Sequence, residues 1–281
     1  MAYRQTEEEN KTGLSGGQAG AGKTDKLQIH DLCVDFATQH GTVHAVKGVT
    51  LTAVKGRITA LVGESGSGKS VTSLAVMDLL ARNGRIASGR ILYGGRDLLT
   101  LPERERRKLN GTVFSMIFQD PSGSLDPLFT IEDQMEEGIL AHRKISRREA
   151  RCLCLEYLRA VNLRDPETLL RARPHELSGG MCQRVMIAIA MALQPDFLIA
   201  DEPTTALDVT VQKQILKKIW HLSREQGMGV LFITHDLGVV AEIADDVCIM
   251  QKGMIVENGP VLEIFEHPRH PYTRTLLQAI M

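Results

Sequence analysis

The sequence has few aromatic residues, almost no net charge and no long apolar run. Phe, Trp and Tyr make up 4% of its 281 residues, whereas hydrophobic residues reach 43%, which is enough for a substantial core. The 33 basic and 34 acidic residues nearly cancel, so the composition does not indicate a surface that binds nucleic acid by charge. A chain of this length is expected to fold as one large domain or as a domain with a subdomain.

Signals for membrane insertion or secretion are also missing from the sequence. The longest apolar run, Val185–Leu193, is about half of the roughly 20 residues that a membrane span needs. No N-terminal apolar segment is typical of a signal peptide. We therefore expect a soluble chain that reaches a membrane only through a partner.

The cysteines do not form a recognisable framework. They are odd in number and scattered, without C-x-x-C spacing: Cys33, Cys152, Cys154, Cys182 and Cys248. We expect buried free thiols in a reducing cytoplasm rather than a metal site.

The chain divides by composition into a polar N-terminal stretch and a folded remainder. Residues 1–25 are rich in Gly, Ser, Thr and Glu and carry hardly any large apolar residue, so we predict a flexible tail. Beyond them, Leu27–Phe36 and Val49–Val54 alternate apolar and polar residues as half-buried antiparallel strands do. Residues 57–62 and 113–118 are more uniformly apolar and are predicted to be more central strands.

The later part of the sequence predicts a buried parallel sheet with a helical insertion. Short apolar runs separated by helical segments are typical of such a sheet; they are Phe197–Ala200, Val230–Thr234 and Val247–Gln251. Arg147–Leu163 has the apolar spacing of an amphipathic helix. Pro121, Pro127, Pro166 and Pro174 bracket this helix-rich middle, which we interpret as a subdomain inserted into the α/β core.

One stretch, GESGSGKS at 63–70, matches the phosphate-loop pattern G-x-x-x-x-G-K-[ST] between a strand and a helix. The strand fixes such a loop, backbone N–H groups wrap the phosphate, and the helix N-terminus adds partial positive charge. Glycines allow close approach of the backbone, Lys69 is expected to reach the β- and γ-phosphates, and the Ser70 hydroxyl to bind Mg²⁺. The predicted nucleotide-binding residues are Gly63, Glu64, Ser65, Gly66, Ser67, Gly68, Lys69 and Ser70.

A second match, Gly17–Thr24, overlaps an LSGGQ sequence at Leu14–Gln18. No strand precedes it and no helix follows it, because the polar tail lies before it and a predicted strand after it. We therefore expect Lys23 and Thr24 to be part of a solvated tail that does not bind nucleotide.

Acidic and polar residues at the ends of other predicted strands are candidates for binding Mg²⁺, the attacking water and the γ-phosphate. Asp201 and Glu202 follow the apolar strand 197–200; Asp201 is expected to hold Mg²⁺ through water and Glu202 to polarise the attacking water. Gln119 follows the strand 113–118 and is placed to reach Mg²⁺ and that water, and His235 follows the strand 230–234, where it is placed to contact the γ-phosphate.

The sequence LSGG at 177–180 opens an apolar helix, so the Ser178 hydroxyl and the helix N–H groups are predicted to form an anion site. Each of these features also has an ordinary structural explanation: a helix N-cap for Ser178, a surface amide for Gln119 and a loop histidine for His235.

Taken together and in order, these motifs resemble those of the ATP-binding-cassette (ABC) ATPases over residues 27–272. The motifs are GESGSGKS (63–70), FQDP (118–121), LSGGMCQR (177–184), FLIADEP (197–203), ALD (206–208) and ITHD (233–236). The resemblance implies an α/β fold: an ABC-type nucleotide-binding domain with a phosphate-loop parallel-sheet core, an antiparallel β subdomain and an inserted helical subdomain.

The resemblance also implies that two copies or paralogues act together. In that family the signature motif, here LSGGMCQR at 177–184, lies across a dimer interface from the phosphate loop. ATP is therefore expected between Lys69 of one subunit and Ser178, Gly179 and Gly180 of the other. Asp208 and His235 are expected to link the two halves. The dimer is expected to close when ATP binds and to open after hydrolysis, and this movement is the power stroke.

Two positions qualify the resemblance. The fifth signature residue is Met181 rather than Gln; because the phosphate contacts come from Ser178 and backbone N–H groups, we expect function to survive. Phe36 stands where the family places an aromatic near adenine, and it is expected either to stack on adenine or to be a core residue of its strand.

The C-terminal half is similar to the oligopeptide, dipeptide and nickel importer ATPases. The stretches that carry this similarity are QDPSGSLDP (119–127), DEPTTALDVTVQKQIL (201–216), THDLGVVAEIADDV (234–247) and HPRHPYTRTLL (267–277). The similarity implies a peripheral ATPase on the cytoplasmic face of the inner membrane, working on two permease subunits fed by a substrate-binding protein. A permease helix is then expected to dock on residues 119–175, whose charged Arg143, Lys144, Arg147 and Arg148 are expected to be a solvated face.

The end of the chain leaves alternatives open. HPRHPYT either carries a family-specific role or is only a proline-ordered turn that leads into a short helix, Thr273–Ile280. Family members usually extend further, some with cysteines for an iron–sulfur cluster and some with a second cassette. We expect a truncated chain or half of a longer protein, and no cluster.

The sequence therefore predicts a Mg²⁺-dependent ATPase subunit of a peptide, glutathione-like or nickel-type importer. The expected organisation is a tail (1–25), an ABC domain (26–265) with a helical subdomain at about 119–178, and a C-terminal importer-type tail (266–281). A non-transport ABC protein acting on nucleic acid or ribosomes is the alternative, and a phosphate-loop kinase is a more distant one. The cargo and the identity of the partner ATPase stay open.

Overall fold

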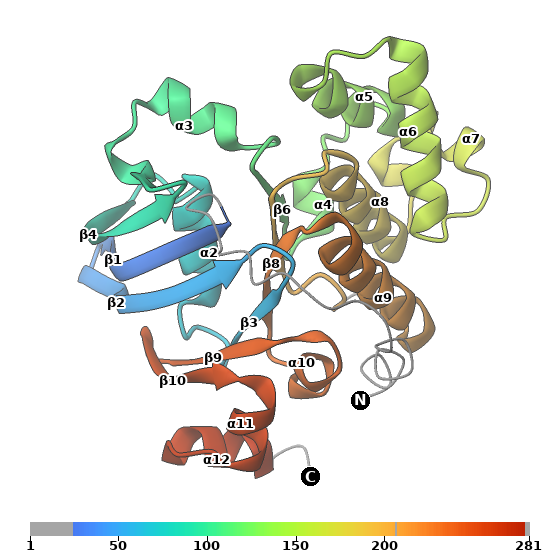
Figure 1. Ribbon diagram of the computed structural model, residues 1–281. Helices are drawn as coiled ribbons and strands as arrows, with labels where there is room; N and C mark the ends of the chain where they lie inside the picture. The colour runs from blue at the N-terminus through green and yellow to red at the C-terminus, as the bar shows by residue number, and fades with distance from the viewer. Residues whose placement is uncertain (1–24, 206, 279–281) are drawn as a thin grey trace, which may run out of the picture. The chain divides into compact units, whose positions relative to one another are not determined.

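The computed structural model describes residues 25–205 and 207–278 (Figure 1). The predicted tail, apart from Asp25, and the second phosphate-loop match at 17–24 lie outside the described residues, as does Ala206 of the ALD motif. The chain contacts define two units: unit 1 comprises residues 1–101 and 230–281, and unit 2 comprises residues 102–229.

Unit 1 contains an antiparallel sheet in the order β2-β1-β4-β5. Its strands are β1 (Lys26–Thr38), β2 (Gly41–Val54), β4 (Gly84–Tyr93) and β5 (Arg96–Asp97). The predicted antiparallel pairing is confirmed, and both predicted strands are longer than the sequence pattern indicated.

A bulge in β1 keeps its apolar residues on one face. Leu27 and Ile29 are buried at odd positions, whereas Leu32 and Val34 are buried at even ones. The pairing register shifts between Ile29 and Leu32, and Asp31 has a positive φ of 47°. The extra residue therefore returns the alternation to the same face of the sheet.

The second sheet of unit 1 has the order β10-β9-β3-β8 within that unit. Its strands are β3 (Ile58–Val62), β8 (Gly229–Thr234), β9 (Asp246–Gln251) and β10 (Met254–Pro260). β3 is parallel to both β8 and β9, and β10 is antiparallel to β9. Every residue of β3 and β8 is buried, as expected for a parallel sheet covered on both faces.

Each helix of unit 1 follows a strand of one of its two sheets or another helix along the chain. They are α2 (Lys69–Met77), the 3₁₀ turn η1 (Leu98–Thr100), α10 (Leu237–Ile243), α11 (Val261–Glu266) and α12 (Pro271–Gln278). α12 begins two residues before the predicted helix Thr273–Ile280, because proline is well suited to the first turn of a helix.

Unit 2 contains two parallel strands and most of the helices. The strands are β6 (Phe114–Ile117) and β7 (Phe197–Asp201). The helices are α3 (Glu103–Leu109), α4 (Pro121–Ser124), α5 (Ile131–His142), α6 (Arg147–Ala160), α7 (Pro166–Leu169), the 3₁₀ turn η2 (Pro174–Glu176), α8 (Gly179–Ala192) and α9 (Val209–Gln226).

Local sequence signals determine where the helices of unit 2 begin and end. α5 and α6 each start with a capping box, formed by Thr130 with Asp133 and by Ser146 with Glu149. Hydrogen bonds from the cap residues lower the pKa of both carboxyls. α6 ends before the predicted Leu163, because Asn162 adopts a positive φ of 57° that stops the helix.

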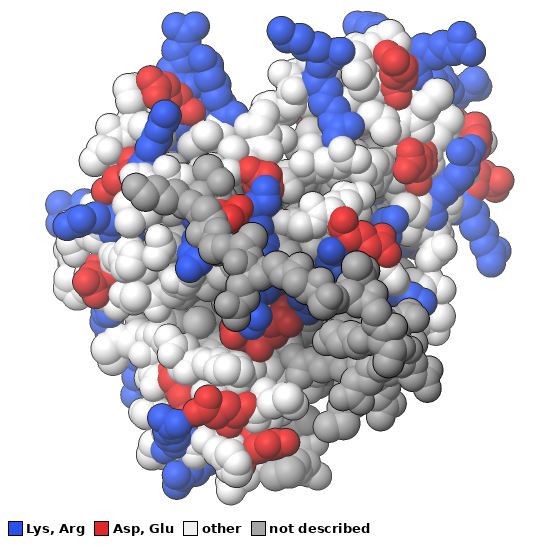
Figure 2. All heavy atoms as spheres, viewed as in Figure 1, with Lys and Arg blue, Asp and Glu red and all other residues white. Residues whose placement is uncertain are grey.

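Charged side chains lie at the surface of unit 2, where Figure 2 shows Lys and Arg gathered over α3 and over α5 and α6. Lys144, Arg147 and Arg148 are exposed, as predicted, and Arg143 is half-buried with a hydrogen bond to Gln194. Within the described part of the chain, no helix combines the length and apolar character needed to cross a membrane.

All cysteines are free thiols. Cys154, Cys182 and Cys248 are buried, and burial raises the pKa of Cys154 and Cys248 to about 12. Cys33 is half-buried and Cys152 is exposed, so the expectation of burial is wrong for Cys152. Its place on the outer side of the amphipathic helix α6 explains the exposure.

Candidate functional site

The loop 63–68 joins β3 to α2 in the setting that the sequence predicts for a phosphate loop. Gly68 precedes the helix with a φ of 107°, a conformation that glycine adopts without strain. A Cβ at Gly63 would lie 2.1 Å from the backbone oxygen of Met250 in β9, so only glycine fits there. The loop therefore lies directly against the neighbouring parallel strand.

The Lys69 side chain turns back into this loop. Its Nζ donates hydrogen bonds to the carbonyl oxygens of Gly63 (2.8 Å) and Glu64 (2.9 Å), and the residue is 6% exposed. The Ser67 hydroxyl is buried, and no hydrogen-bond partner for it is present among the described residues. The loop thus places an ammonium group and a buried hydroxyl beside exposed Glu64, Ser65 and Gly66, which suits an anionic ligand.

Neighbouring segments of unit 1 hold the loop by hydrogen bonds. Gly253, in the β9–β10 turn, donates its N–H to the carbonyl of Ser67 (2.9 Å) and accepts from the N–H of Lys47 (2.8 Å). The Tyr272 hydroxyl of α12 accepts the N–H of Glu64 at 3.1 Å. Sequence reasoning missed the Tyr272 contact, although it singled out the HPRHPYT stretch that contains it.

His235 lies at the same sheet edge as the loop. Thr234 pairs with Val62 across β8 and β3, so His235 and Gly63 follow equivalent positions on adjacent parallel strands. His235 is exposed, and Asp236 after it caps α10 through the N–H groups of Gly238 and Val239. The contact of His235 with a bound phosphate stays a prediction.

Phe36 lies in β1 and is half-buried. A Cβ at Gly84 would lie 2.7 Å from its ring, so the ring packs against a glycine on β4. A half-exposed aromatic ring suits adenine stacking, and it also suits a strand residue at the margin of the core.

In unit 2, β7 delivers Asp201 and Glu202 at its carboxyl end. Asp201 is 3% exposed, whereas Glu202 is half-buried and has a positive φ of 46°. Such a conformation is strained for a non-glycine residue and recurs at functional sites. The Thr205 hydroxyl donates to the Glu202 carboxylate at 3.2 Å and thereby orients it.

Gln119 reaches the same edge from β6. Ile117 pairs with Ala200, so Gln119 and Glu202 both stand two residues beyond a paired position. Gln119 is exposed and lies beyond the buried strand β6, so its side chain is accessible to a ligand.

A buried amide supports the turn after Glu202. The Gln183 Nε2 of α8 donates to the carbonyl of Pro203 at 2.7 Å, and Gln183 is 1% exposed. This bond ties the signature helix to the acidic turn, and sequence reasoning assigned no role to Gln183. Its place in the quoted LSGGMCQR motif was the available signal.

The signature residues open α8 at the surface. Ser178 is the N-cap and its hydroxyl accepts the N–H of Met181 at 3.3 Å. Ser178 and Gly179 are exposed, and Gly180 is half-buried. Arg184 donates to the carbonyl of Gly180 at 3.2 Å, which fixes the first turn of the helix.

Asp208 likewise caps α9, where its Oδ1 accepts the N–H groups of Thr210 and Val211 at 3.0 Å each. Asp208 is exposed, and the Val209 side chain beside it is 68% exposed. Both therefore lie on the surface of unit 2.

The predicted site residues fall into two sets. Unit 1 carries Phe36, the loop 63–70 and His235; unit 2 carries Gln119, Ser178, Gly179, Gly180, Asp201, Glu202 and Asp208. Ser70, Gln119 and Asp201 offer hydroxyl, amide and carboxylate oxygens, which are the donors that Mg²⁺ prefers. Among residues 25–205 and 207–278, no cluster of three or more His, Cys, Asp or Glu side chains could hold a metal by itself.

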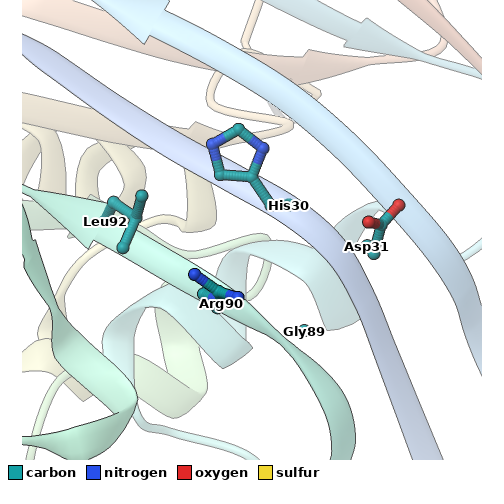
Figure 3. A pocket seen from close by; sticks show the side chains of 5 residues that line it. All are labelled: His30, Asp31, Gly89, Arg90 and Leu92. Carbon is teal, nitrogen blue, oxygen red and sulfur yellow. The ribbon is translucent and has the colours of Figure 1, made fainter.

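A separate surface hollow in unit 1 contains none of these residues. Its lining comes from His30 and Asp31 on β1 and from Gly89, Arg90 and Leu92 on the adjacent β4 (Figure 3). It lies at the β1 bulge, where a Cβ on Gly89 would come within 2.6 Å of Leu32.

A strand–phosphate loop–helix unit, together with carboxylates at the end of another strand, is typical of α/β phosphate-loop nucleotide-binding proteins. Comparison with protein families matches residues 46–205 to "ABC transporter" and residues 256–281 to "Oligopeptide/dipeptide transporter, C-terminal region". The chain therefore belongs to the ABC transporter family and is one of its ATP-hydrolysing subunits. The predicted fold class is confirmed.

Curated relatives are similar over nearly the whole chain. The chain is 53% identical to the peptidoglycan transport ATP-binding protein YejF of Agrobacterium fabrum, over 90% of its own length and 46% of that protein. It is 48% identical to the dipeptide transport ATP-binding protein DppD of Bacillus subtilis, over 90% of its length and 76% of that protein. It thus spans about half of the first relative and about three quarters of the second.

Solved structures of ABC cassettes are also similar to this chain. A dimeric post-hydrolysis state of the ATP-binding cassette MJ0796 bound to ADP and Pi matches with a TM-score of 0.77 and 26% identity, over 84% of this chain and 98% of that one. CbiO1 from Clostridium perfringens, part of the complex cbiONQ, matches with a TM-score of 0.69 and 28% identity, over 86% and 92%. ABC cassettes use ATP with a divalent metal, dimerise and work with membrane-spanning transporter components.

Proposed function

We propose that the chain is the ATPase subunit that powers an importer of peptides or of related substrates. One observation carries the proposal: a phosphate loop set between β3 and α2 occurs in a chain whose relatives are named for dipeptide and oligopeptide transport. The C-terminal match at residues 256–281 supports this class of cargo. Dipeptide, oligopeptide, glutathione-like and nickel cargo share this type of ATPase, and the permeases and binding protein select among them.

In the proposed reaction, the loop 63–70 and Lys69 bind the phosphates of ATP and fix the γ-phosphate for attack. Glu202 polarises a water, whose oxygen forms a bond to the γ-phosphorus while the bond to the β–γ bridging oxygen breaks, giving ADP and phosphate. Gln119 orients the same water and His235 contacts the γ-phosphate. Phe36 stacks on the adenine.

Ser70 and Gln119 would hold Mg²⁺, and Asp201 would hold it through water. When bound, the ion supplies positive charge to the phosphates. The donor oxygens of these three residues support this role, and Asp201 at the end of a buried strand has the fixed position that it requires.

We further propose that the site is completed by a second ATPase subunit, identical or different. Ser178, Gly179 and Gly180 of one subunit then contact the γ-phosphate held by Lys69 of the other. The exposure of Ser178, Gly179 and Val209 supports an interface at this surface, as does the dimeric state of the MJ0796 cassette. Asp208 at the start of α9 communicates between the subunits.

A helix of one permease subunit docks on the segment 119–175. The transporter has two permease subunits, and a substrate-binding protein delivers cargo to them. Leu128 and Phe129 lie within this segment, and they are 75% and 53% exposed. Exposed large apolar side chains suit contact with a partner helix. The subunit is then peripheral, on the cytoplasmic face of the inner membrane, with a cassette at 26–265, a helical subdomain at about 119–178 and an importer-type tail at 266–281.

The proposed reaction is tested by ATP turnover of Glu202→Gln in the complex assembled with its permeases. The variant keeps the shape of Glu202 but removes the group that polarises water, so turnover is expected to fall at least roughly 100-fold while ATP still binds. Glu225→Gln is the control, because Glu225 is an exposed residue of α9 that pairs with His221. Near-normal turnover in the Glu202 variant would remove Glu202 from its role, and failure to assemble with permeases would contradict the transport proposal.

A further inference from the structure

The HPRHPYT stretch, residues 267–273, reaches the phosphate loop from the far end of the sequence. Tyr272 lies in the first turn of α12, 208 residues after Glu64, and its hydroxyl accepts the Glu64 N–H at 3.1 Å. Tyr272 is 8% exposed and Glu64 is exposed, so the bond is partly buried. The contact lies within unit 1.

Glu64 is held through both of its backbone polar groups. Its N–H is bonded to Tyr272 and its carbonyl oxygen accepts Lys69 Nζ at 2.9 Å. A single peptide segment therefore connects the C-terminal stretch with the lysine that binds phosphate. A shift of Glu64 moves one of the two carbonyl oxygens that orient the Lys69 ammonium.

We propose that Tyr272 is a positioning residue of the nucleotide site: it fixes the phosphate loop at Glu64 and thereby sets the position of Lys69 for ATP. The inference rests on the proposed ATP site at 63–70. It assigns to the C-terminal stretch an active part in nucleotide binding, beyond that of a proline-ordered turn.

The stretch before Tyr272 is itself firmly anchored. The Glu257 carboxylate on β10 accepts the N–H groups of Arg269 (2.8 Å) and His270 (3.0 Å). The His270 Nδ1 in turn accepts the N–H of Tyr272 at 3.2 Å. These bonds fix the start of α12 against the sheet that carries the loop, so the phenol has a defined position.

The hydroxyl is also chemically suited to the role. The Glu64 N–H is partly buried, and leaving such a group without an acceptor costs stability. Burial, together with the nearby Glu64 carboxylate, raises the pKa of Tyr272. The phenol therefore stays neutral at physiological pH and adds no negative charge beside the phosphate site.

Tyr272→Phe tests the proposal, because it removes the hydroxyl and keeps the ring. Tyr157→Phe is the matched control: Tyr157 is also buried, and its hydroxyl also accepts one amide N–H, from Gln194 at 3.0 Å in unit 2. ATP affinity is measured by equilibrium binding at a temperature where all variants are folded. We expect Tyr272→Phe to bind ATP about three- to tenfold more weakly, and Tyr157→Phe to bind it like the wild type.

Amide hydrogen exchange separates positioning from general loosening of the fold. In Tyr272→Phe, the Glu64 amide is expected to exchange faster, while the Gly253 amide, bonded to Ser67, keeps its wild-type rate. Unchanged ATP affinity in Tyr272→Phe would overturn the inference, as would equal losses in both Phe variants or a general rise in exchange. A wild-type protein that fails to bind ATP would instead contradict the proposed function on which the inference rests.

Discussion

At Gly63, the lack of a side chain determines how closely the phosphate loop approaches β9. A Cβ there would lie 2.1 Å from the Met250 carbonyl oxygen and 2.9 Å from the Ser67 hydroxyl. The Met250 carbonyl belongs to the backbone of the strand and cannot yield as a flexible side chain would. The geometry of the loop thus depends on one small residue at its entrance.

Gly63→Ala is therefore expected to weaken ATP binding and to lower stability by about 1–3 kcal/mol, because the added methyl group displaces the loop from β9. Thermal unfolding and equilibrium ATP binding measure the two effects. Gly138→Ala is the control: Gly138 lies within α5 with nothing within 4 Å of an added Cβ. It is expected to raise stability by about 0.5–1 kcal/mol, and equal behaviour of the two variants would contradict the account.

At this scale, the sequence predicted residues whose role follows from a motif and its flanks. Lys69 and Glu202 stand at fixed offsets from a strand end: Lys69 opens α2 after the loop that follows β3, and Glu202 comes directly after β7. Tyr272, Gln183 and Thr205 could not be assigned in this way. Tyr272 meets Glu64 across 208 residues, and no local pattern specifies a contact at that separation.

Glu257 shows how an element is held by a carboxylate from another strand. Burial alone would raise the pKa of Glu257, but the nearby Thr273 hydroxyl and the backbone hydrogen bonds from Arg269 and His270 outweigh it and lower the pKa. A carboxyl with a lowered pKa stabilises the folded state above its unfolded pKa of about 4.3. That stability is lost as the pH falls through the lower, folded-state pKa.

Glu257→Gln is accordingly expected to have a lower Tm than the wild type at pH 7. The difference in Tm between the two proteins is expected to become smaller as the pH falls from about 5 to about 3. The carboxylate loses its charge in that window in the wild type, and glutamine has none to lose. Glu266→Gln, which removes the charge of an exposed glutamate on α11, is the control for general charge effects. A Tm difference that stays constant or grows on acidification would show that the Glu257 charge does not anchor this turn.

Elements were more predictable than their ends. Apolar alternation predicted β1 and β2, and continuous apolar runs predicted β3, β7, β8 and β9. The β1 bulge at Asp31 was not foreseen, because a single inserted residue leaves most of the alternation intact. The end of α6 depends on the backbone conformation of Asn162, which the apolar pattern of that helix does not encode.

At the scale of the whole molecule, the site residues are divided between two units of one chain. Family order connects them: the phosphate loop, the signature and the acidic strand end occur in the sequence of an ABC cassette. The proposed partner contacts of Ser178 and Asp208 lie beyond what one chain can specify, because the surface that completes them belongs to a second subunit. The cargo is likewise determined by other subunits.

The central claim is that ATP binds at 63–70, although 17–24 matches the same phosphate-loop pattern. Equilibrium ATP binding of Lys69→Ala and Lys23→Ala, each checked for thermal stability without nucleotide, tests this most directly. We predict that Lys23→Ala binds ATP like the wild type and that Lys69→Ala binds at least about tenfold more weakly, because the Lys69 side chain turns back into the loop between β3 and α2. Loss of binding in Lys23→Ala with wild-type binding in Lys69→Ala would contradict the account.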